Sequence, residues 1–316
     1  VTAHAGETVW ATAKRAGMPI PGLCTSEHLA PFGSCRLCVC EIDGQKGTPA
    51  SCTTPVQAGM AVRTRTDQLT RLRKNVMELL LSEQPDGGVV PEALRALARS
   101  VGLEQVRYRR PAARASVRDD SNPFFRFDNT ICISCARCVR ACDEIQGTGA
   151  LTMVGRGFFS RPMPGASRYG DPSVGFAESN CVSCGACVKE CPTGALAEKT
   201  LLQQGVPTAT VRTTCAYCGV GCAFDAGVRD DRVVTMQPAD DGPSNQGHAC
   251  MKGRFGWTYI YAEDRLTTPL LREGTEWRKL SWPAALDRIA QEFSRIKSAY
   301  GADALACVSS SRGTNE

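Results

Sequence analysis

Sixteen of the eighteen cysteines in this chain fall into four sets of four, each with a spacing typical of iron–sulfur ligands. Two sets share the spacing C-x2-C-x2-C-x3-C: Cys132, Cys135, Cys138 and Cys142, and Cys181, Cys184, Cys187 and Cys191. The others are Cys24, Cys35, Cys38 and Cys52, spaced C-x10-C-x2-C-x13-C, and Cys215, Cys218, Cys222 and Cys250, spaced C-x2-C-x3-C-x27-C. Only Cys40 and Cys307 remain. Because iron–sulfur clusters exchange single electrons, four such sites indicate an electron-transfer protein.

Disulfides and structural zinc are the alternative uses of so many cysteines. Short C-x2-C loops in tandem, in a chain of 316 residues, favour metal over disulfides. Residues 1–10 show no export signal, so we expect a cytoplasmic protein. No apolar run approaches the roughly 18–20 residues of a membrane span, and no span is expected. A brown rather than colourless preparation would exclude the zinc hypothesis.

The composition favours several small modules over one large core. Hydrophobic residues make up 42% of the chain but aromatic residues only 6%, so metal ligation should contribute to folding. The formal net charge of +5 is offset when clusters are bound, since each carries roughly −2 with its thiolates. The basic stretch 107–118 contains one aromatic residue, Tyr108, and is interpreted as a solvated linker face. We therefore expect no nucleic-acid partner.

The elements around the first set predict a β-grasp module over residues 1–68. A short helix over 7–16 precedes Cys24, and residues 39–43 and 60–66 alternate as strands do. The module resembles the plant-type [2Fe–2S] ferredoxin fold. Its cysteine spacing is that of the large iron–sulfur subunit of respiratory NADH dehydrogenase and its relatives. Cys40, on the strand after the ligand loop, is interpreted as a packing residue.

Residues 69–121 contain no cysteine and are predicted to form a helical linker. Leucines recur at helical spacing in two stretches, 69–80 and 94–101, separated by a turn over 84–88. In the family that this chain resembles, the region carries a His-x3-C-x2-C-x5-C site for a further [4Fe–4S] cluster. Here Gln84 stands where the histidine would fall, and no cysteine follows before Cys132. We expect one [2Fe–2S] and three [4Fe–4S] clusters, without the histidine-ligated one.

The two C-x2-C-x2-C-x3-C runs predict a two-cluster ferredoxin module over residues 122–205, with an inserted loop over 152–176. In such modules the fourth cysteine of each run ligates the other cluster. Cys142 should therefore complete the site of the Cys181 run, and Cys191 that of the Cys132 run.

The last set lies in a predicted module over residues 206–265, which includes a hairpin over 224–238. Cys215-Ala216-Tyr217-Cys218-Gly219-Val220-Gly221-Cys222, followed later by Cys250-Met251-Lys252-Gly253-Arg254, resembles the N-terminal [4Fe–4S] domain of molybdopterin-dependent oxidoreductases. The match is closest to the cytoplasmic formate dehydrogenases. The resemblance implies that Lys252 lies between cluster and pterin and assists electron transfer. His248 is interpreted as structural, since four thiolates already complete the site.

Residues 266–316 are predicted to form the start of a molybdopterin-binding α/β domain. A helix capped by Ser281 and ended by Gly301 precedes a short buried strand over 304–308, with Cys307 in the core. Residues 309–316 resemble the loop that opens this domain in formate dehydrogenases. The family's metal-ligating and catalytic residues are expected beyond Glu316.

The predicted fold class is therefore a multi-module α+β protein, and the module order resembles the α subunit of NAD-dependent molybdenum or tungsten formate dehydrogenases. The resemblance implies oxidation of formate to carbon dioxide on a molybdenum- or tungsten-bis-molybdopterin guanine dinucleotide, with a flavin- and NAD-binding iron–sulfur subunit as partner. The alternative is an electron-transfer subunit of an NADH dehydrogenase or hydrogenase complex. Lys252 and the 309–316 loop speak against it, and metal analysis for molybdenum or tungsten separates the two.

Overall fold

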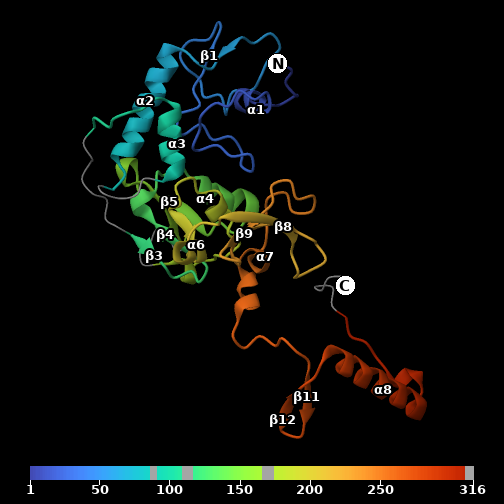
Figure 1. The fold of residues 1–316 in the computed structure, drawn as a ribbon. Coiled ribbons are helices and arrows are strands. Elements are labelled where there is room, and N and C mark those ends of the chain that lie inside the picture. Colours follow the sequence, from blue (N-terminus) through green and yellow to red (C-terminus); the bar gives the residue numbers. More distant parts are fainter. Residues whose placement is uncertain (86–90, 109–116, 166–173, 310–316) are drawn as a thin grey trace.

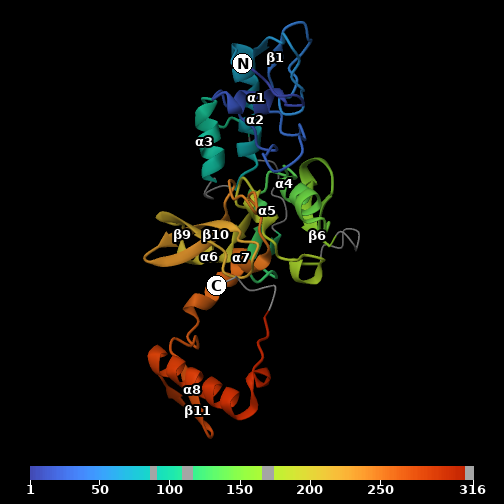
Figure 2. The same cartoon turned by 90° about the vertical axis from the view of Figure 1, so that its right-hand side faces the viewer.

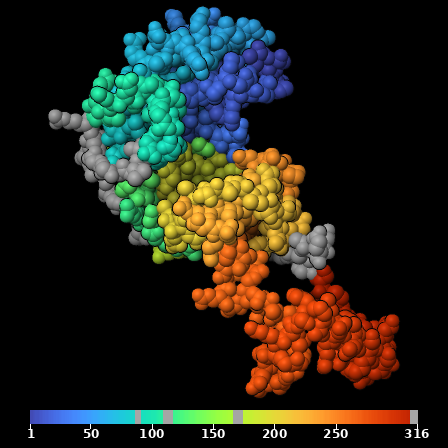
Figure 3. Space-filling view, viewed as in Figure 1, coloured from blue at the N-terminus to red at the C-terminus, as the bar shows by residue number. Residues whose placement is uncertain are grey.

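The computed structural model describes residues 1–85, 91–108, 117–165 and 174–309, and they form a series of small mixed modules (Figure 1). Three modules are stacked against one another, whereas residues 264–309 extend away from them (Figures 2 and 3). The predicted multi-module α+β fold class is confirmed. Among the described residues, no helix has the length and apolar character to cross a bilayer.

Apart from α2 and α8, the described regular elements are short. The α-helices are α1 (Val9–Arg15), α2 (Asp67–Ser82), α3 (Glu92–Ser100), α4 (Arg137–Arg140), α5 (Ala186–Lys189), α6 (Lys199–Gln204), α7 (Met251–Phe255) and α8 (Trp282–Tyr300), and a π-helix, η2 (Ala141–Gln146), continues α4. All strand pairs are antiparallel: β1 (Glu41–Ile42) with β2 (Val62–Arg63); β4 (Phe125–Asp128) between β3 (Arg118–Asp119) and β7 (Leu196–Glu198); β5 (Leu151–Val154) with β6 (Arg161–Pro164); β9 (Ala223–Arg229) between β8 (Ala209–Thr214) and β10 (Arg232–Pro238); and β11 (Leu270–Glu273) with β12 (Glu276–Lys279).

In the first module, the predicted helix and strands are present but shorter than the sequence suggested. Helix α1 begins where the side chain of Thr8 accepts a hydrogen bond from the Ala11 amide. The strand expected over 39–43 reduces to β1 and an isolated bridge from Val39 to Ala50. The chain between the cysteines is irregular because it wraps around the ligand set, and Arg36 there takes a left-handed φ of 59°. Cys40 is fully buried in the module's core, as a packing residue should be.

Helices α2 and α3 form where the leucine spacing predicted them. Leu23 and Leu37, from the chain around the first cysteine set, share one core with Met77 and Leu94 of the two helices. The side chain of Thr66 caps α2 by accepting from the Leu69 amide. The turn expected between the helices falls largely on residues 86–90, which lie outside the described part.

Arg73 of α2 connects this helical pair to the ligand loop of the first module. Its buried guanidinium donates to the carbonyls of Leu37 at 3.1 Å and Val39 at 2.7 Å, which flank Cys38. A third bond, 2.8 Å long, reaches the Thr64 carbonyl. One side chain therefore satisfies three backbone acceptors, two in the irregular ligand loop and one directly after β2.

In the described part of the basic stretch 107–118, Arg107 and Arg118 are exposed, as a solvated face requires, but Arg107 also pairs with a buried carboxylate. The carboxylate of Glu78 is 1% exposed, and Arg107 donates to it from its backbone amide and its guanidinium, the shortest guanidinium contact being 2.6 Å. Arg107 is thus the partner of a buried charge, which composition alone did not indicate. Arg109, Arg110 and Arg114 lie outside the described residues.

The two-cluster module has the expected internal repeat. The prediction of an inserted loop over 152–176 was wrong in part. The hairpin β5–β6 occupies its first half, with Pro162 and Pro164 on β6. Proline lacks an N–H group, so the sequence argued against a strand, yet a two-stranded ribbon tolerates proline on its free edge. Residues 166–173 of the predicted loop lie outside the described part.

The prediction of a buried strand over 304–308 was also wrong. Helix α8 forms, with Ser281 accepting from the Ala284 amide, but Leu286, Ile289 and Phe293 on its apolar face are exposed. Residues after it form one short 3-10 turn, Ala302–Ala304, and then irregular chain, in which Cys307 is exposed. No described strand lies beside this segment. Its backbone therefore forms no strand-to-strand hydrogen bonds, and its side chains are not covered. The loop over 310–316 lies outside the described residues.

Replacing Arg73 with methionine should destabilise the first module by about 2–4 kcal/mol, because buried carbonyls would lose their donor. Arg71→Met is the matched control, since Arg71 lies exposed on the same helix. Urea unfolding followed by the visible absorption of the bound [2Fe–2S] cluster measures both variants. Equal midpoints for the two variants would show that Arg73 does not hold the ligand loop.

Candidate iron–sulfur centres

The first set of thiols converges on one small site. Cys24, Cys38 and Cys52 are buried and Cys35 is half-buried. The Cys35 amide donates to the Cys24 sulfur at 3.3 Å, and the Leu23 amide donates to the Cys35 sulfur at 3.4 Å. Hydrogen bonding with Cys35 lowers the pKa of Cys24 to about 2, and hydrogen bonding with Cys24 raises the pKa values of Cys35 and Cys52. The pattern marks a group of thiols too close for all to ionise without a metal.

The two ferredoxin-type runs repeat one local geometry. The Ser134 amide donates to the Cys132 sulfur and the Ser183 amide to the Cys181 sulfur, both at 3.4 Å. The fourth cysteine of each run also accepts a backbone amide. For Cys142 the donor is Ala150 at 3.2 Å, and for Cys191 it is Leu196 at 3.4 Å. Amides directed at cysteine sulfur stabilise thiolate and tune cluster potential.

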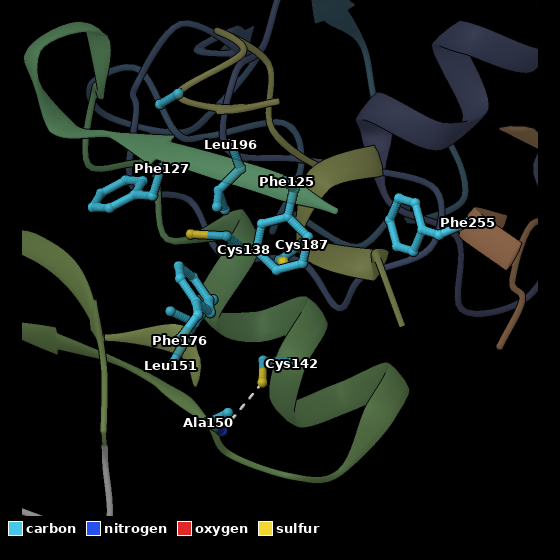
Figure 4. Close-up of a cluster of buried hydrophobic side chains, with 11 residues drawn as sticks. Phe125, Phe127, Cys138, Cys142, Ala150, Leu151, Phe176, Cys187, Leu196 and Phe255 are labelled. Atoms are coloured by element: carbon cyan, nitrogen blue, oxygen red, sulfur yellow. Dashed lines mark hydrogen bonds between the residues drawn. The ribbon is translucent and has the colours of Figure 1, made fainter. Parts of the chain in front are cut away.

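The fourth cysteine of each run interacts electrostatically with a cysteine of the other run. Burial raises the pKa of Cys135 to about 12, and the neighbouring charge of Cys191 adds to the rise. In the other run, burial raises the pKa of Cys184, and the added charge there is that of Cys142. Cys138 and Cys187 lie next to Phe125 in the shared core, with the Cys142 sulfur directed at Ala150 (Figure 4). This arrangement supports crossed ligation as a proposal.

The fourth set surrounds a pocket of about 810 Å³, lined by all four of its thiols and by Lys252. Cys215 is buried, while Cys250 is exposed and stands at the start of α7. A side chain at Gly253 would lie 2.7 Å from the Phe224 ring and 3.2 Å from the Cys215 sulfur, so this position requires glycine. Lys252 is exposed beside the ligands, where the sequence motif placed it. Cys184 of the ferredoxin module lines the same pocket, which makes the two sites neighbours.

These donor sets fit iron–sulfur clusters. The thiols are grouped in fours, seven of the sixteen are buried and only Cys250 is exposed, and burial raises the pKa values of Cys138 and Cys187 well above the usual range. Buried thiolates therefore need cationic iron beside them. Within the described ranges, no three His, Cys, Asp or Glu side chains converge to hold a single metal ion. A cluster separates its thiolates more widely, because they bind different irons.

Contacts that the sequence did not indicate join the first site to the ferredoxin module. Arg140, between Cys138 and Cys142, donates to the carbonyls of Cys24 and Ala30, the latter at 2.6 Å. Its guanidinium also lies 4.7 Å from the centre of the Phe32 ring. Glu144, one helical turn later, accepts from the Ala30 amide at 2.7 Å. The helix that carries two cluster ligands is thus bound directly to the ligand loop of the first module.

A second junction involves all three modules. His28 of the first module lies 3.1 Å from the Asp240 carboxylate, and Lys189 of α5 donates to the same oxygen at 2.5 Å. The rings of His28 and His248 meet edge to face at 5.3 Å. Burial lowers the pKa of His248, which agrees with a structural rather than a ligand role.

Gln84 occupies a buried position at the end of α2. It is 5% exposed, and neither atom of its side-chain amide has a hydrogen-bond partner among the described residues. The backbone N–H of Gln84 donates to the backbone carbonyl of Leu81. The residue in the place of the family's histidine is therefore covered by protein.

Family comparisons match four consecutive segments. Residues 1–67 match the 2Fe-2S iron-sulfur cluster binding domain, 131–195 the 4Fe-4S dicluster domain, 208–262 the molybdopterin oxidoreductase Fe4S4 domain, and 265–316 the molybdopterin oxidoreductase family.

Among curated proteins, the NADPH-Fe(3+) oxidoreductase subunit alpha of Geobacter sulfurreducens is 33% identical over 100% of this chain and 36% of its own length. A Staphylococcus haemolyticus protein named "Putative formate dehydrogenase" is 31% identical over 94% of this chain and 34% of its own. This chain thus spans about a third of these relatives. A chain from the crystal structure of NAD+-reducing [NiFe]-hydrogenase is similar with a TM-score of 0.51 and 34% identity, over 63% of this chain and 83% of the other.

Crossed ligation predicts an asymmetric lesion. Cys142→Ala should damage the cluster of Cys181, Cys184 and Cys187 and spare the cluster of its own run, while Cys191→Ala should do the reverse. Cys307→Ala is the control, because Cys307 is exposed and outside all four sets. Electron paramagnetic resonance of the reduced variants resolves the clusters. Loss confined to the Cys132 cluster in Cys142→Ala would mean that each run closes its own site.

Proposed function

Since this chain belongs to the molybdopterin oxidoreductases and carries their iron–sulfur part, we propose that it transfers electrons between a formate-oxidising site and a flavin- and NAD-binding partner subunit. Molybdenum or tungsten, held by two molybdopterin guanine dinucleotides, would supply the two-electron oxidation of formate to carbon dioxide. The chain's own cysteines would hold one [2Fe–2S] and three [4Fe–4S] clusters.

The observation that carries the proposal is the uninterrupted order of contacts between the four cysteine sets. Cys184 shares a pocket with Cys215 and Cys250. The two ferredoxin sets share one core, which contains Cys138 and Cys187. Arg140 then joins the ferredoxin helix to the carbonyl of Cys24. Neighbouring sites in this order allow single electrons to pass along the chain without a histidine-ligated relay.

Lys252 and the last segment favour the pterin end of this proposal. Lys252 lies two residues after the Cys250 ligand and lines the same pocket. Its ammonium group can donate hydrogen bonds to an anionic group on the outer side of the site. Residues 265–316 match the molybdopterin oxidoreductase family, and formate is named in relatives that cover 94% of this chain.

An electron-transfer subunit of an NAD-reducing hydrogenase-like complex is the second candidate. The hydrogenase chain named above favours it, because 83% of that chain aligns with this one at 34% identity. The alignment covers only 63% of this chain, and residues 208–316 match families defined by molybdopterin. The formate proposal accounts for more of the sequence.

Anaerobic mixing of the full-length, metal-loaded protein with formate tests the proposal. Formate should bleach the visible absorption of the clusters, and adding the flavin subunit with NAD should restore it. Metal analysis of the same full-length protein is made in parallel. Clusters that formate does not bleach, in full-length protein that takes up neither molybdenum nor tungsten, would favour the second candidate and overturn the first.

Lys252→Ala should slow formate-driven reduction of the clusters about tenfold or more, because one charge-assisted interaction beside the ligands is lost. Cluster content should stay unchanged, since Lys252 is exposed and no ligand. Lys46→Ala, at an exposed turn of the first module, is the control. Stopped-flow absorption under formate measures the rate. A rate equal to that of the control would remove Lys252 from the route.

A further inference from the structure

Arg254 of α7 is a buried cation that crosses from one module into the next. It follows Cys250 by one helical turn, yet its side chain is 1% exposed. Its guanidinium donates to the carboxylate of Glu198, on β7 of the ferredoxin module, at 2.7 Å, and to the side-chain carbonyl of Gln237 at 2.8 Å. Glu198 is also 1% exposed. This ion pair is fully removed from water at the boundary between two cluster-binding modules.

The guanidinium lies against the ligand loop of the Cys181 run. Gly185 lies between Cys184 and Cys187 with a φ of +78°, and a Cβ atom there would lie 2.7 Å from Nε of Arg254. That Nε group has no hydrogen-bond partner among the described residues. Burial lowers the pKa of Arg254, whereas the charges of Glu198, Cys187 and Cys184 oppose that shift. The loop thus approaches a cation at a distance that only glycine allows.

Arg254 also lies between two cluster sites. A pocket of about 370 Å³ is lined by Arg254 together with Cys184 of one set and Cys222 and Cys250 of another. Stability alone does not explain a charge in this place, because well-packed apolar residues often replace a buried ion pair without loss. The position points instead to an electrostatic role.

Glu198 is held so that it offsets this charge only in part. Its carboxylate accepts from Thr235 at 2.7 Å and from Gln237 at 2.8 Å, besides Arg254. These bonds also tie the carboxylate to β10. Glu198 contacts Arg254 at Nη2, whereas the loop of Cys184 and Cys187 lies against Nε.

We propose that Arg254 sets the reduction potential of the cluster held by Cys181, Cys184, Cys187 and Cys142, and positions that site against the one held by Cys215 and Cys250. Reduction adds an electron to an already anionic site, so a buried cation beside its ligands favours the reduced state. Glu198 limits the effect. The inference rests on the cluster assignment proposed above.

Redox titration of the cluster-loaded protein, followed by electron paramagnetic resonance, tests this role through opposite shifts. Arg254→Gln should lower the midpoint potential of the Cys181 cluster, by at least the 59 mV that corresponds to a tenfold change in a one-electron equilibrium. Glu198→Gln should raise it, because the cation is then unopposed. The [2Fe–2S] potential should not change in either variant.

Two further variants separate charge from packing. Arg254→Lys keeps the charge and should change the one-electron reduction equilibrium of the Cys181 cluster by less than threefold. Arg212→Gln removes an arginine of the same module that is exposed and paired with Asp225 and Asp241, and should leave all potentials unchanged. Iron content and signal intensity, measured in parallel, report separately on the cluster assignment.

Shifts of the same sign in Arg254→Gln and Glu198→Gln would overturn the proposal, as would unchanged potentials in variants with full iron content. A shift in Arg254→Lys as large as in Arg254→Gln would assign the effect to packing. If Arg254→Gln does not fold, Glu198→Gln decides, since an unchanged potential there contradicts the role. Loss of the Cys181 signal in Cys142→Ala tests the assignment independently of these potentials.

Discussion

Buried thiolate charge is the constraint on which the structure depends. Sixteen cysteines are grouped in fours, and seven of them are buried, where an unpaired thiolate is costly. Backbone amides satisfy part of this charge, at Cys24, Cys142 and Cys191 among others. Cationic iron must satisfy the rest. Metal ligation replaces part of the hydrophobic core in such a fold. The ligand loops therefore have little regular structure, and the chain has few aromatic residues.

Cations from one module bound to acceptors of the next determine how the modules pack. Arg140 reaches the carbonyls of the first ligand loop, Lys189 reaches Asp240, and Arg254 reaches Glu198. Hydrogen bonds are directional, so these contacts fix orientation in a way that apolar packing between small modules does not. They also place positive charge beside sites that become more negative on reduction. The same residues can therefore hold the sites together and adjust their potentials.

Residue spacing predicted most of the local elements, because short-range periodicity determines them. Helices α2, α3 and α8 and the β9–β10 hairpin formed where the pattern placed them. The β5–β6 hairpin was missed because its prolines argue against strands, and the burial of Cys307 was wrong because its segment has no described neighbour. The contacts of Arg140 and Arg254 could not be predicted, because a single arginine near a cysteine forms no recognisable sequence pattern. Their roles come from partners far away in the sequence.

The central claim is that four cluster sites follow one another, with the [2Fe–2S] module bound directly to the ferredoxin module and Gln84 covered by protein where the family's histidine would stand. Iron and acid-labile sulfide analysis of the purified, fully loaded protein tests this most directly. One [2Fe–2S] and three [4Fe–4S] clusters require about fourteen iron and fourteen sulfide per chain. About eighteen of each would reveal a fifth cluster between the modules and contradict the account.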